Sequence, residues 1–181
     1  MTSLVRPDLR LRESWAAGVG EFDGHMDGSG DWEVERFDTS QEGAPAVVAA
    51  LLAKADPATV LPQDRVHCTY LWITDGDGAD EEFVGFLALR HSLTAWLLEE
   101  GGHIGYSVRP SRRREGHATR ALALAVRRAA ELGIERALVT CDDDNDASRR
   151  TIERCGGVYE DTRNGKRRYW IDTTDQTPGK D

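Results

Sequence analysis

The stretch that most constrains the fold covers residues 103–132, where an apolar segment, an arginine-rich turn and a long amphipathic run follow one another. Within 103–108, large apolar residues alternate with smaller ones, which predicts a half-buried strand that Pro110 brings to an end. From Gly116 the apolar residues recur with helical spacing, and Gly133 supplies a helix stop. The sequence therefore predicts a loop with three consecutive arginines between a strand and the N-terminus of a helix.

This junction has the chemistry of an anion site. The first turn of a helix carries unpaired N–H groups and the positive end of the helix dipole. Gly116 and Ala118 have little or no side chain, so a ligand could approach the backbone closely. Arg112, Arg113 and Arg114 add charge, and arginine can bind a phosphate through two hydrogen bonds. We therefore expect a phosphate or pyrophosphate site, the alternative being a solvated arginine turn before an ordinary surface helix.

The remaining elements are predicted from apolar periodicity and turn residues. Asn164-Gly165 is a strong signal for a type I′ hairpin, and residues 93–102 are expected to be a plain connection. The predicted strands cover 4–7, 65–74, 83–91, 137–141, 158–161 and 167–172, and the other predicted helices cover 9–22, 45–55 and 146–155. The expected order is strand, two helices, three strands, helix, strand, helix and hairpin.

The run Arg113-Arg114-Glu115-Gly116-His117-Ala118 resembles the Arg/Gln-x-x-Gly-x-Gly/Ala signature of the GNAT superfamily of acyl-CoA N-acyltransferases. Residues 101–113, and later 142–145 with 148–150, resemble a bacterial branch of acetyltransferases, and the resemblance covers about residues 83–171. It implies an α/β fold in a single domain over 1–173, followed by a polar tail over 174–181. The implied mixed sheet has six to seven strands, is splayed at the central strand, and is flanked by about four helices.

In that family the turn binds the pyrophosphate of acetyl-CoA and the strand binds the pantetheine arm, so the resemblance implies acetyl-CoA as co-substrate and no metal. The residues that it assigns to the cofactor are Tyr106, Ser107, Val108, Arg113, Arg114, Glu115, Gly116, His117, Ala118, Thr119, Asn145 and Ser148. Asn145 matches a family asparagine that contacts pantetheine, and a helix cap is its alternative role. Arg149 and Arg150 are expected either to approach the adenosine phosphate or to face water.

Acetyl transfer needs a polarised thioester carbonyl and a proton for the departing thiolate. A backbone N–H of the central strand can polarise the carbonyl in the manner of an oxyanion hole, and the family pattern favours Val108. Ile152 stands where many relatives have a tyrosine that protonates the thiolate. Either Tyr106, Tyr159 or Tyr169 takes over this role, or the thiolate leaves unassisted.

A general base should have a pKa near neutrality. His103, at the start of the central strand, and His91 qualify by residue type, and Glu99, Glu100 and Glu35 would qualify if partly buried or through a water molecule. For each of these residues a structural or surface role is the alternative. A reaction without a dedicated base also remains open.

Charge is unevenly distributed along the 181 residues. Residues 1–100 hold 7 Lys and Arg against 19 Asp and Glu, and residues 101–181 hold 16 against 13. The basic half suits anionic coenzyme A and the acidic half a cationic amine, although acidic loops that maintain solubility are a sufficient alternative. The sequence pI of about 5.1 argues against a nucleic-acid partner.

The acceptor amine is expected between the segment 24–38 and the mouth of the central strand, near His103 and the hairpin at Asn164. Two aromatics of this segment, Trp32 and Phe37, could cover an ammonium group. Its acidic residues are Asp27, Asp31, Glu33, Glu35 and Asp38, joined by Asp23 just before it, and its glycines are Gly24, Gly28 and Gly30. The glycines would allow the segment to close over a ligand. The alternative is a mobile loop with its aromatics in the core.

Several classes are disfavoured. No apolar run approaches eighteen residues and no signal-peptide pattern is present, so a cytoplasmic protein without a membrane partner is expected. Three cysteines without a CxxC pair suit a reducing compartment. Asp142, Asp144 and Asp146 imitate a calcium loop, but Ala147 stands where the sharp turn needs glycine.

The favoured function is transfer of an acetyl group from acetyl-CoA to a primary amine of a small molecule or peptide, directly within a ternary complex. An amino-sugar antibiotic is an alternative acceptor. The missing tyrosine at Ile152 motivates a second hypothesis, a non-catalytic module that binds acyl-CoA or a nucleotide. The identity of the acceptor and the choice between monomer and homodimer are left open.

Overall fold

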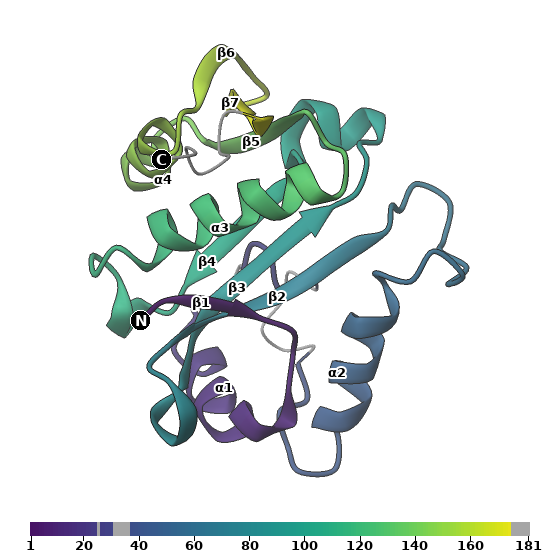
Figure 1. The fold of residues 1–181 in the computed structure, drawn as a ribbon, viewed down its shortest axis with the longest axis vertical. Coiled ribbons are helices and arrows are strands. Elements are labelled where there is room, and N and C mark those ends of the chain that lie inside the picture. Colours follow the sequence, from purple (N-terminus) through teal and green to yellow (C-terminus); the bar gives the residue numbers. More distant parts are fainter. Residues whose placement is uncertain (25, 31–36, 175–181) are drawn as a thin grey trace, which may run out of the picture.

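The computed structural model describes residues 1–24, 26–30 and 37–174. Its centre is a seven-stranded mixed sheet in the order β1-β2-β3-β4-β5-β7-β6 (Figure 1). The strands are β1 (Ser3–Val5), β2 (Cys68–Asp75), β3 (Glu82–Arg90), β4 (Ile104–Val108), β5 (Arg136–Asp142), β6 (Val158–Arg163) and β7 (Lys166–Asp172). Neighbouring strands are antiparallel except for β4 and β5, which are parallel.

Four α-helices accompany the sheet: α1 (Arg12–Val19), α2 (Ala44–Ala53), α3 (His117–Glu131) and α4 (Asp146–Arg154). Short 3₁₀ turns lie at Leu9–Leu11, Gly78–Asp80 and Pro110–Arg112. The element order and the mixed α/β architecture confirm the sequence-based expectation, although several ends differ. The strand predicted from Arg65, for example, begins only at Cys68.

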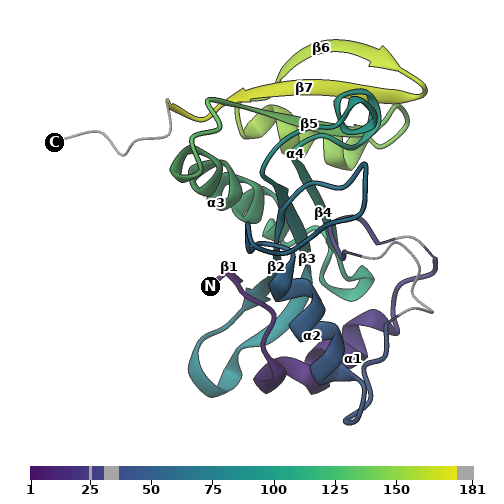
Figure 2. The same ribbon diagram turned by 90° about the vertical axis from the view of Figure 1, so that its right-hand side faces the viewer.

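The helices cover opposite faces of the sheet, because alternate strand residues point to opposite sides. Leu71 and Ile73 of β2 pack in the cluster that includes α3 and α4, whereas Trp72 packs with α1 and α2. The α3 side holds the larger cluster, and the four-helix arrangement is visible in Figures 1 and 2. None of the helices in the described part of the chain is long and apolar enough to cross a membrane.

Two predicted chain reversals are confirmed by their backbone conformation. Asn164 and Gly165 have φ angles of 49° and 75°, as the two central positions of a type I′ turn require. Gly133 follows the last turn of α3 with φ of 77°, a left-handed conformation that glycine adopts without steric cost.

Residues 93–102 connect β3 to β4, and they contain a π-turn at Leu97–Gly101. One expectation about the segment 24–38 is wrong. Phe37 lies in the core rather than over a ligand, because its ring centroid lies 6.0 Å from that of Trp15 and 5.7 Å from that of Phe86.

Two of the three glycines of the segment 24–38 are closely packed. A Cβ on Gly28 would approach Gly105 O to 2.4 Å, and a Cβ on Gly30 would meet the side chain of Leu51 at 2.5 Å, whereas a Cβ on Gly24 would meet nothing within 4 Å. Gly28 therefore lies directly on β4, and Gly30 lies against α2. The expected contributions of Asp31, Trp32, Glu33 and Glu35 fall outside the described residues.

Candidate functional site

Strands β4 and β5 separate shortly after they meet. Among the described residues they share one register pair, Ile104 with Val139. Just before it, the His103 N–H donates to Leu138 O (2.7 Å), and the Leu138 N–H donates to Nδ1 of His103 (2.9 Å). The sheet is therefore splayed at its central strand, and His103 joins the two strands at the closed end of the gap.

The backbone of β4 faces this gap at alternate residues. The Arg109 N–H donates to Val84 O, so the backbone at Arg109 is directed to β3. Because N–H and C=O groups alternate in direction along an antiparallel strand, those of Tyr106 and Val108 point toward β5. The Val108 carbonyl accepts a hydrogen bond from Arg113 Nε (3.0 Å), while the Val108 N–H faces the gap.

A cavity of about 920 Å³ fills the gap and extends along it in both directions. At one end lie the arginine turn, the start of α3 and the start of α4. At the other end lie the segment after α1, the π-turn and the start of β7. The predicted cofactor residues that line the cavity are Tyr106, Ser107, Val108, Arg113, Arg114, Gly116, His117, Ala118, Thr119, Asn145 and Ser148. Glu115 is the one predicted member that does not line it.

The anion turn, defined as residues 109–116, leads into an uncapped helix. Gly116 is the N-cap of α3 with φ of 84°, and no side chain caps the first N–H groups of the helix. Arg114 also has a left-handed backbone, with φ of 70°. The open N–H groups and the exposed side chains of Arg113 and Arg114 line the cavity together and form a site suited to an anion.

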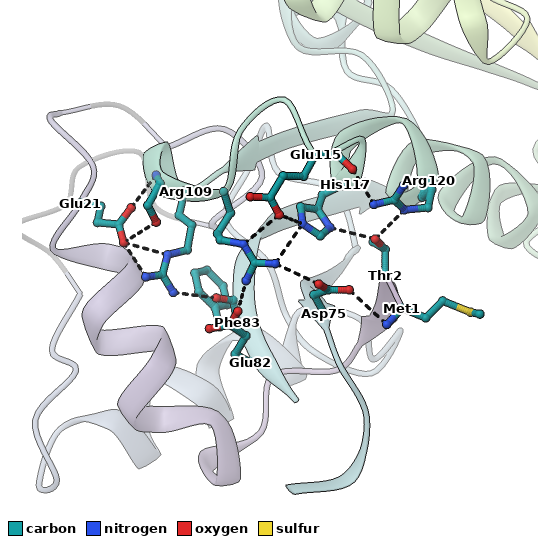
Figure 3. A network of polar contacts seen from close by, with 12 residues as sticks. Met1, Thr2, Glu21, Asp75, Glu82, Phe83, Arg109, Glu115, His117 and Arg120 are labelled. Atoms are coloured by element: carbon teal, nitrogen blue, oxygen red, sulfur yellow. Dashed lines mark hydrogen bonds and ion pairs between the residues drawn. The ribbon is translucent and has the colours of Figure 1, made fainter. Parts of the chain in front are cut away.

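Acidic residues of the N-terminal half fasten the start of the anion turn (Figure 3). Glu21, just after α1, accepts hydrogen bonds from Arg109 Nε (2.9 Å) and Nη2 (2.5 Å), and from the Ser111 N–H (2.8 Å) and hydroxyl (2.9 Å). Partial burial by itself would raise the pKa of Glu21, but the bonds from Arg109 and Ser111 lower it to about 2. Glu21 is therefore a carboxylate at neutral pH.

Arg112 lines the cavity, and its guanidinium is also part of the scaffold of the turn. It pairs with Asp75 (2.9 Å), with Glu82 and with Glu115 (3.0 Å). Three carboxylates thus bind one guanidinium. Part of the acidic excess of the N-terminal half has this structural use.

The side chain of His117 is also turned into the protein. It is 2% exposed, its Nδ1 lies 2.8 Å from the Thr2 hydroxyl, and its Nε2 lies 3.1 Å from Glu115 Oε2. Arg120 Nε donates to the same Thr2 hydroxyl (2.7 Å). β1 is thereby tied to the first turn of α3 (Figure 3), so Glu115 and His117 support the anion turn through their side chains.

The start of α4 forms another wall of the cavity. The side chain of Asn145 accepts a hydrogen bond from the Ser148 N–H (3.0 Å), so Asn145 caps α4. The Ser148 hydroxyl lies 2.9 Å from the hydroxyl of Tyr106 on β4. Burial raises the pKa of Tyr106 well above its ordinary value, so this hydroxyl stays protonated. Arg150 lines the cavity, whereas Arg149 pairs with Asp146 (2.9 Å).

Of the candidate acids, Tyr106 lies on the cavity wall and the other tyrosines do not. Ile152, at the position of the common family tyrosine, is completely buried in the α3 cluster. Tyr169 is 1% exposed, and the exposed Tyr159 shares a hydrogen bond with Thr162. The geometry therefore favours Tyr106 as the donor of a proton in the cavity.

Among the candidate bases that the structure describes, Glu100 is the one that lines the cavity. Burial, and then the charge of Arg90, lowers the pKa of His103 to about 4, and its Nδ1 already accepts the Leu138 N–H. His91 lies beside the Thr69 hydroxyl (2.8 Å), and neither histidine lines the cavity. Glu99 pairs with Arg163 (2.8 Å) away from the cavity, whereas Glu100 lines it. Glu35 lies outside the described residues.

Residues that sequence reasoning missed line the other end of the cavity. Phe22 and Trp96 contribute aromatic surface, and Arg90 and Lys166 contribute charge, next to Asp27 and Glu100. The sequence offered one signal for these residues, which is that Trp96 and Glu100 lie in the connection just before the central strand. No periodicity or motif indicates that they line a cavity.

The acidic run after β5 is used in ion pairs. Asp142 pairs with Lys166, Asp143 with Arg167 (2.5 Å) and Asp146 with Arg149. In the part of the chain that the structure describes, no group of three or more His, Cys, Asp and Glu side chains could hold a metal ion.

The fold of this chain recurs in known proteins. Similar solved structures include the microcin C7 self-immunity acetyltransferase MccE in complex with acetyl-CoA and AMP, at 14% identity and a TM-score of 0.63, covering 94% of this chain and 92% of that chain. Another is RimJ of Mycobacterium smegmatis in complex with CoA-disulfide, at 21% identity and a TM-score of 0.62, covering 96% and 82%. A putative ribosomal-protein-serine acetyltransferase from Vibrio cholerae matches at 16% identity and a TM-score of 0.61, covering 94% and 93%. At these identities the likeness shows the fold alone.

At the level of sequence, a search of curated proteins gives no match. The family model described as Acetyltransferase (GNAT) domain, in contrast, matches residues 21–158. The matched stretch contains the anion turn, the splayed strands and the start of α4. The chain therefore belongs to the GNAT acetyltransferase family.

Proposed function

We propose that this protein transfers an acetyl group from acetyl-CoA directly to a primary amine of a small molecule or peptide. One observation supports this above the others: a single cavity joins an uncapped helix N-terminus to a gap lined by the exposed backbone of β4. A pyrophosphate fits the first feature and the amide groups of pantetheine fit the second. Such a cavity holds donor and acceptor together, so no acyl-enzyme step is required.

We assign the cofactor contacts by position. The N–H groups of 116–119 and the side chains of Arg113 and Arg114 bind the pyrophosphate, the β4 backbone over 106–108 binds pantetheine, and Asn145 and Ser148 border it from α4. The Val108 N–H, which points into the gap, polarises the thioester carbonyl, where negative charge develops during attack.

The proton balance assigns a role to Tyr106. The amine attacks as the neutral base, the new C–N bond forms, and the C–S bond breaks with its electron pair remaining on sulfur. The Tyr106 hydroxyl, held beside Ser148 at 2.9 Å, gives its proton to this thiolate. The proton lost by the amine passes to solvent.

Titration of the protein with acetyl-CoA in a calorimeter tests the cofactor site, and a screen of amines for release of free thiol tests the reaction. We expect saturable binding and turnover with at least one amine, amino-sugar antibiotics included. Absence of binding at about 1 mM acetyl-CoA would refute the proposal.

A second candidate is a non-catalytic acyl-CoA-binding module. Ile152, completely buried where many relatives carry a tyrosine, favours it. The two candidates differ in one measurement, because turnover of any amine excludes the module, whereas binding without turnover across the screen supports it.

A further inference from the structure

The π-turn Leu97–Gly101, between β3 and β4, is fixed by side chains from other elements. Arg90 of β3, Thr140 of β5 and Arg168 of β7 donate to backbone carbonyl oxygens of the turn and of the following glycine, over distances of 2.5 to 3.1 Å. Arg168 is itself 2% exposed. A π-turn is rare and is often found at functional sites. Here three strands hold one firmly at the mouth of the cavity.

The fixed turn presents two different side chains to the cavity. Trp96, directly before the turn, lies on the cavity wall and is 45% exposed, and Glu100 lies on the same wall. The neighbouring Leu98 and Glu99 do not line the cavity. Exposure of a large aromatic ring to water costs free energy in proportion to its area, so a ligand that covers Trp96 would be stabilised there.

Charge at this end of the cavity favours a cation. Three carboxylates line it: Asp27, Glu100 and Asp142. Glu100 accepts a hydrogen bond from Asn164 Nδ2 (3.4 Å), and Asp142 is paired with Lys166. Partial burial alone would lower the pKa of Lys166, but the bond to Asp142 and the charges of Asp142, Asp27 and Glu100 raise it. The field of these carboxylates thus already stabilises one ammonium group. Arg90, the other cation on this wall, is directed to turn carbonyls through Nη1.

The amine that reacts cannot be the group that this field recognises. A nucleophilic amine must be neutral, and a carboxylate field stabilises the protonated form instead. An acceptor suited to both requirements carries one amine for the reaction and a second, protonated nitrogen for the carboxylates and the indole ring.

We propose that Trp96 and Glu100, together with Asp27, form an acceptor subsite for molecules with at least two basic nitrogens, one of which remains charged. This inference rests on the proposed function, since it assigns the acceptor end of the same cavity. The class includes aliphatic diamines and polyamines as well as amino sugars.

Butane-1,4-diamine and butylamine differ by the second nitrogen and suit the test. Each amine is titrated into the protein alone and into the protein saturated with CoA, which cannot transfer a group. We expect the diamine to bind about tenfold more tightly, the value of one net charge-assisted hydrogen bond. Equal affinities would overturn the proposal.

The π-turn supplies its own matched controls. Glu100→Gln and Trp96→Ala are expected to weaken diamine binding about tenfold and to leave the affinity for CoA within a factor of about two. Glu99→Gln changes the same residue type one position away, and Leu98→Ala truncates a neighbouring apolar side chain; both should leave diamine binding unchanged. If Glu100→Gln behaves like Glu99→Gln, the subsite is wrongly assigned.

The two proposals fail in different ways. If the wild-type protein does not bind CoA, the proposed function falls, while diamine titration of the protein alone still decides the subsite. If CoA binds normally and the diamine binds no more tightly than butylamine, the subsite alone is refuted.

Trp96→Phe keeps an aromatic ring and should retain most of the diamine binding. It therefore shows whether a loss of binding in Trp96→Ala comes from the missing ring or from a folding defect.

Discussion

Glu21 and Arg109 form a two-pronged ion pair, with distances of 2.5 and 2.9 Å, between the end of α1 and the first residue of the anion turn. The same carboxylate also accepts two hydrogen bonds from Ser111. Phe22, next to Glu21, lines the cavity, so Glu21 joins the segment after α1 to the anion turn.

Substitution of Glu21 should therefore affect the pyrophosphate selectively. We expect Glu21→Gln to weaken acetyl-CoA binding about three- to tenfold, because the start of the turn loses its anchor. S-acetylpantetheine lacks the pyrophosphate, and its turnover should change by less than about twofold. Glu13→Gln is the control, since Glu13 is 93% exposed on α1, the helix that precedes Glu21. An equal loss with both thioesters would show a general defect instead.

Gly116 and Gly133 provide a pair of glycines with similar backbone cost. Their φ angles are 84° and 77°, so alanine at either position should destabilise the fold by about 1 kcal/mol. At Gly116 a Cβ would also approach Arg120 Nη1 to 2.9 Å, whereas it would meet nothing within 4 Å at Gly133. We expect only the Gly116 variants to lose acetyl-CoA affinity, most of all Gly116→Glu, which adds a negative charge. Thermal unfolding and calorimetry together separate the two effects.

Loss of the Tyr106 hydroxyl should slow the reaction rather than weaken binding. We expect Tyr106→Phe to lower kcat about 10- to 100-fold with little change in KM for acetyl-CoA, as for removal of a general acid. Tyr159→Phe removes a hydroxyl that is bonded to Thr162 away from the cavity, and it should be neutral. An unchanged kcat in Tyr106→Phe would mean that the thiolate leaves without assistance.

The two roles of Asn145 can be separated by substitution. Asn145→Ala removes the cap of α4 and should cost about 1 kcal/mol of stability. Asn145→Asp keeps a capping oxygen but loses the amide donors, so it should restore stability while acetyl-CoA affinity stays reduced. If affinity returns together with stability, Asn145 acts through the cap alone.

The lowered pKa of His103 predicts how the free energy of unfolding depends on pH. Its pKa in the folded protein is about 4, below the ordinary value of 6.5, because its burial disfavours the charged form. The unfolded chain therefore binds more protons, and the contribution of His103 is complete above pH 6.5 and is lost as pH falls toward 4. The free energy of unfolding should fall by up to about 3 kcal/mol more in the wild type than in His103→Gln over this range. Parallel pH profiles would contradict the assignment.

Local patterns in the sequence determined the elements and their order. The alternation over 103–108, the turn at Asn164-Gly165 and the stop at Gly133 depend on neighbours along the chain, so the sequence shows them directly. The same holds for Gly116 before α3 and for Asn145 as the cap of α4. These local features were enough to predict residues that line one end of the cavity, at the anion turn and the start of α4.

Tertiary structure decided which side chains remain available to a ligand. Arg112 and Arg113 are adjacent and chemically identical, yet Asp75 and Glu82 neutralise Arg112, while the side chain of Arg113 is exposed beside the cavity. Those carboxylates lie far away in the sequence, and no local pattern reports the pairing. Phe37 and Trp96 differ in the same way. Phe37 packs against aromatic rings in the core. Trp96 lies on the cavity wall, next to a turn that side chains of three strands hold in place. Secondary structure follows from short-range periodicity. Which charged and hydrogen-bonding groups of a site remain available to a ligand depends instead on long-range contacts, and these form only when the sheet is assembled.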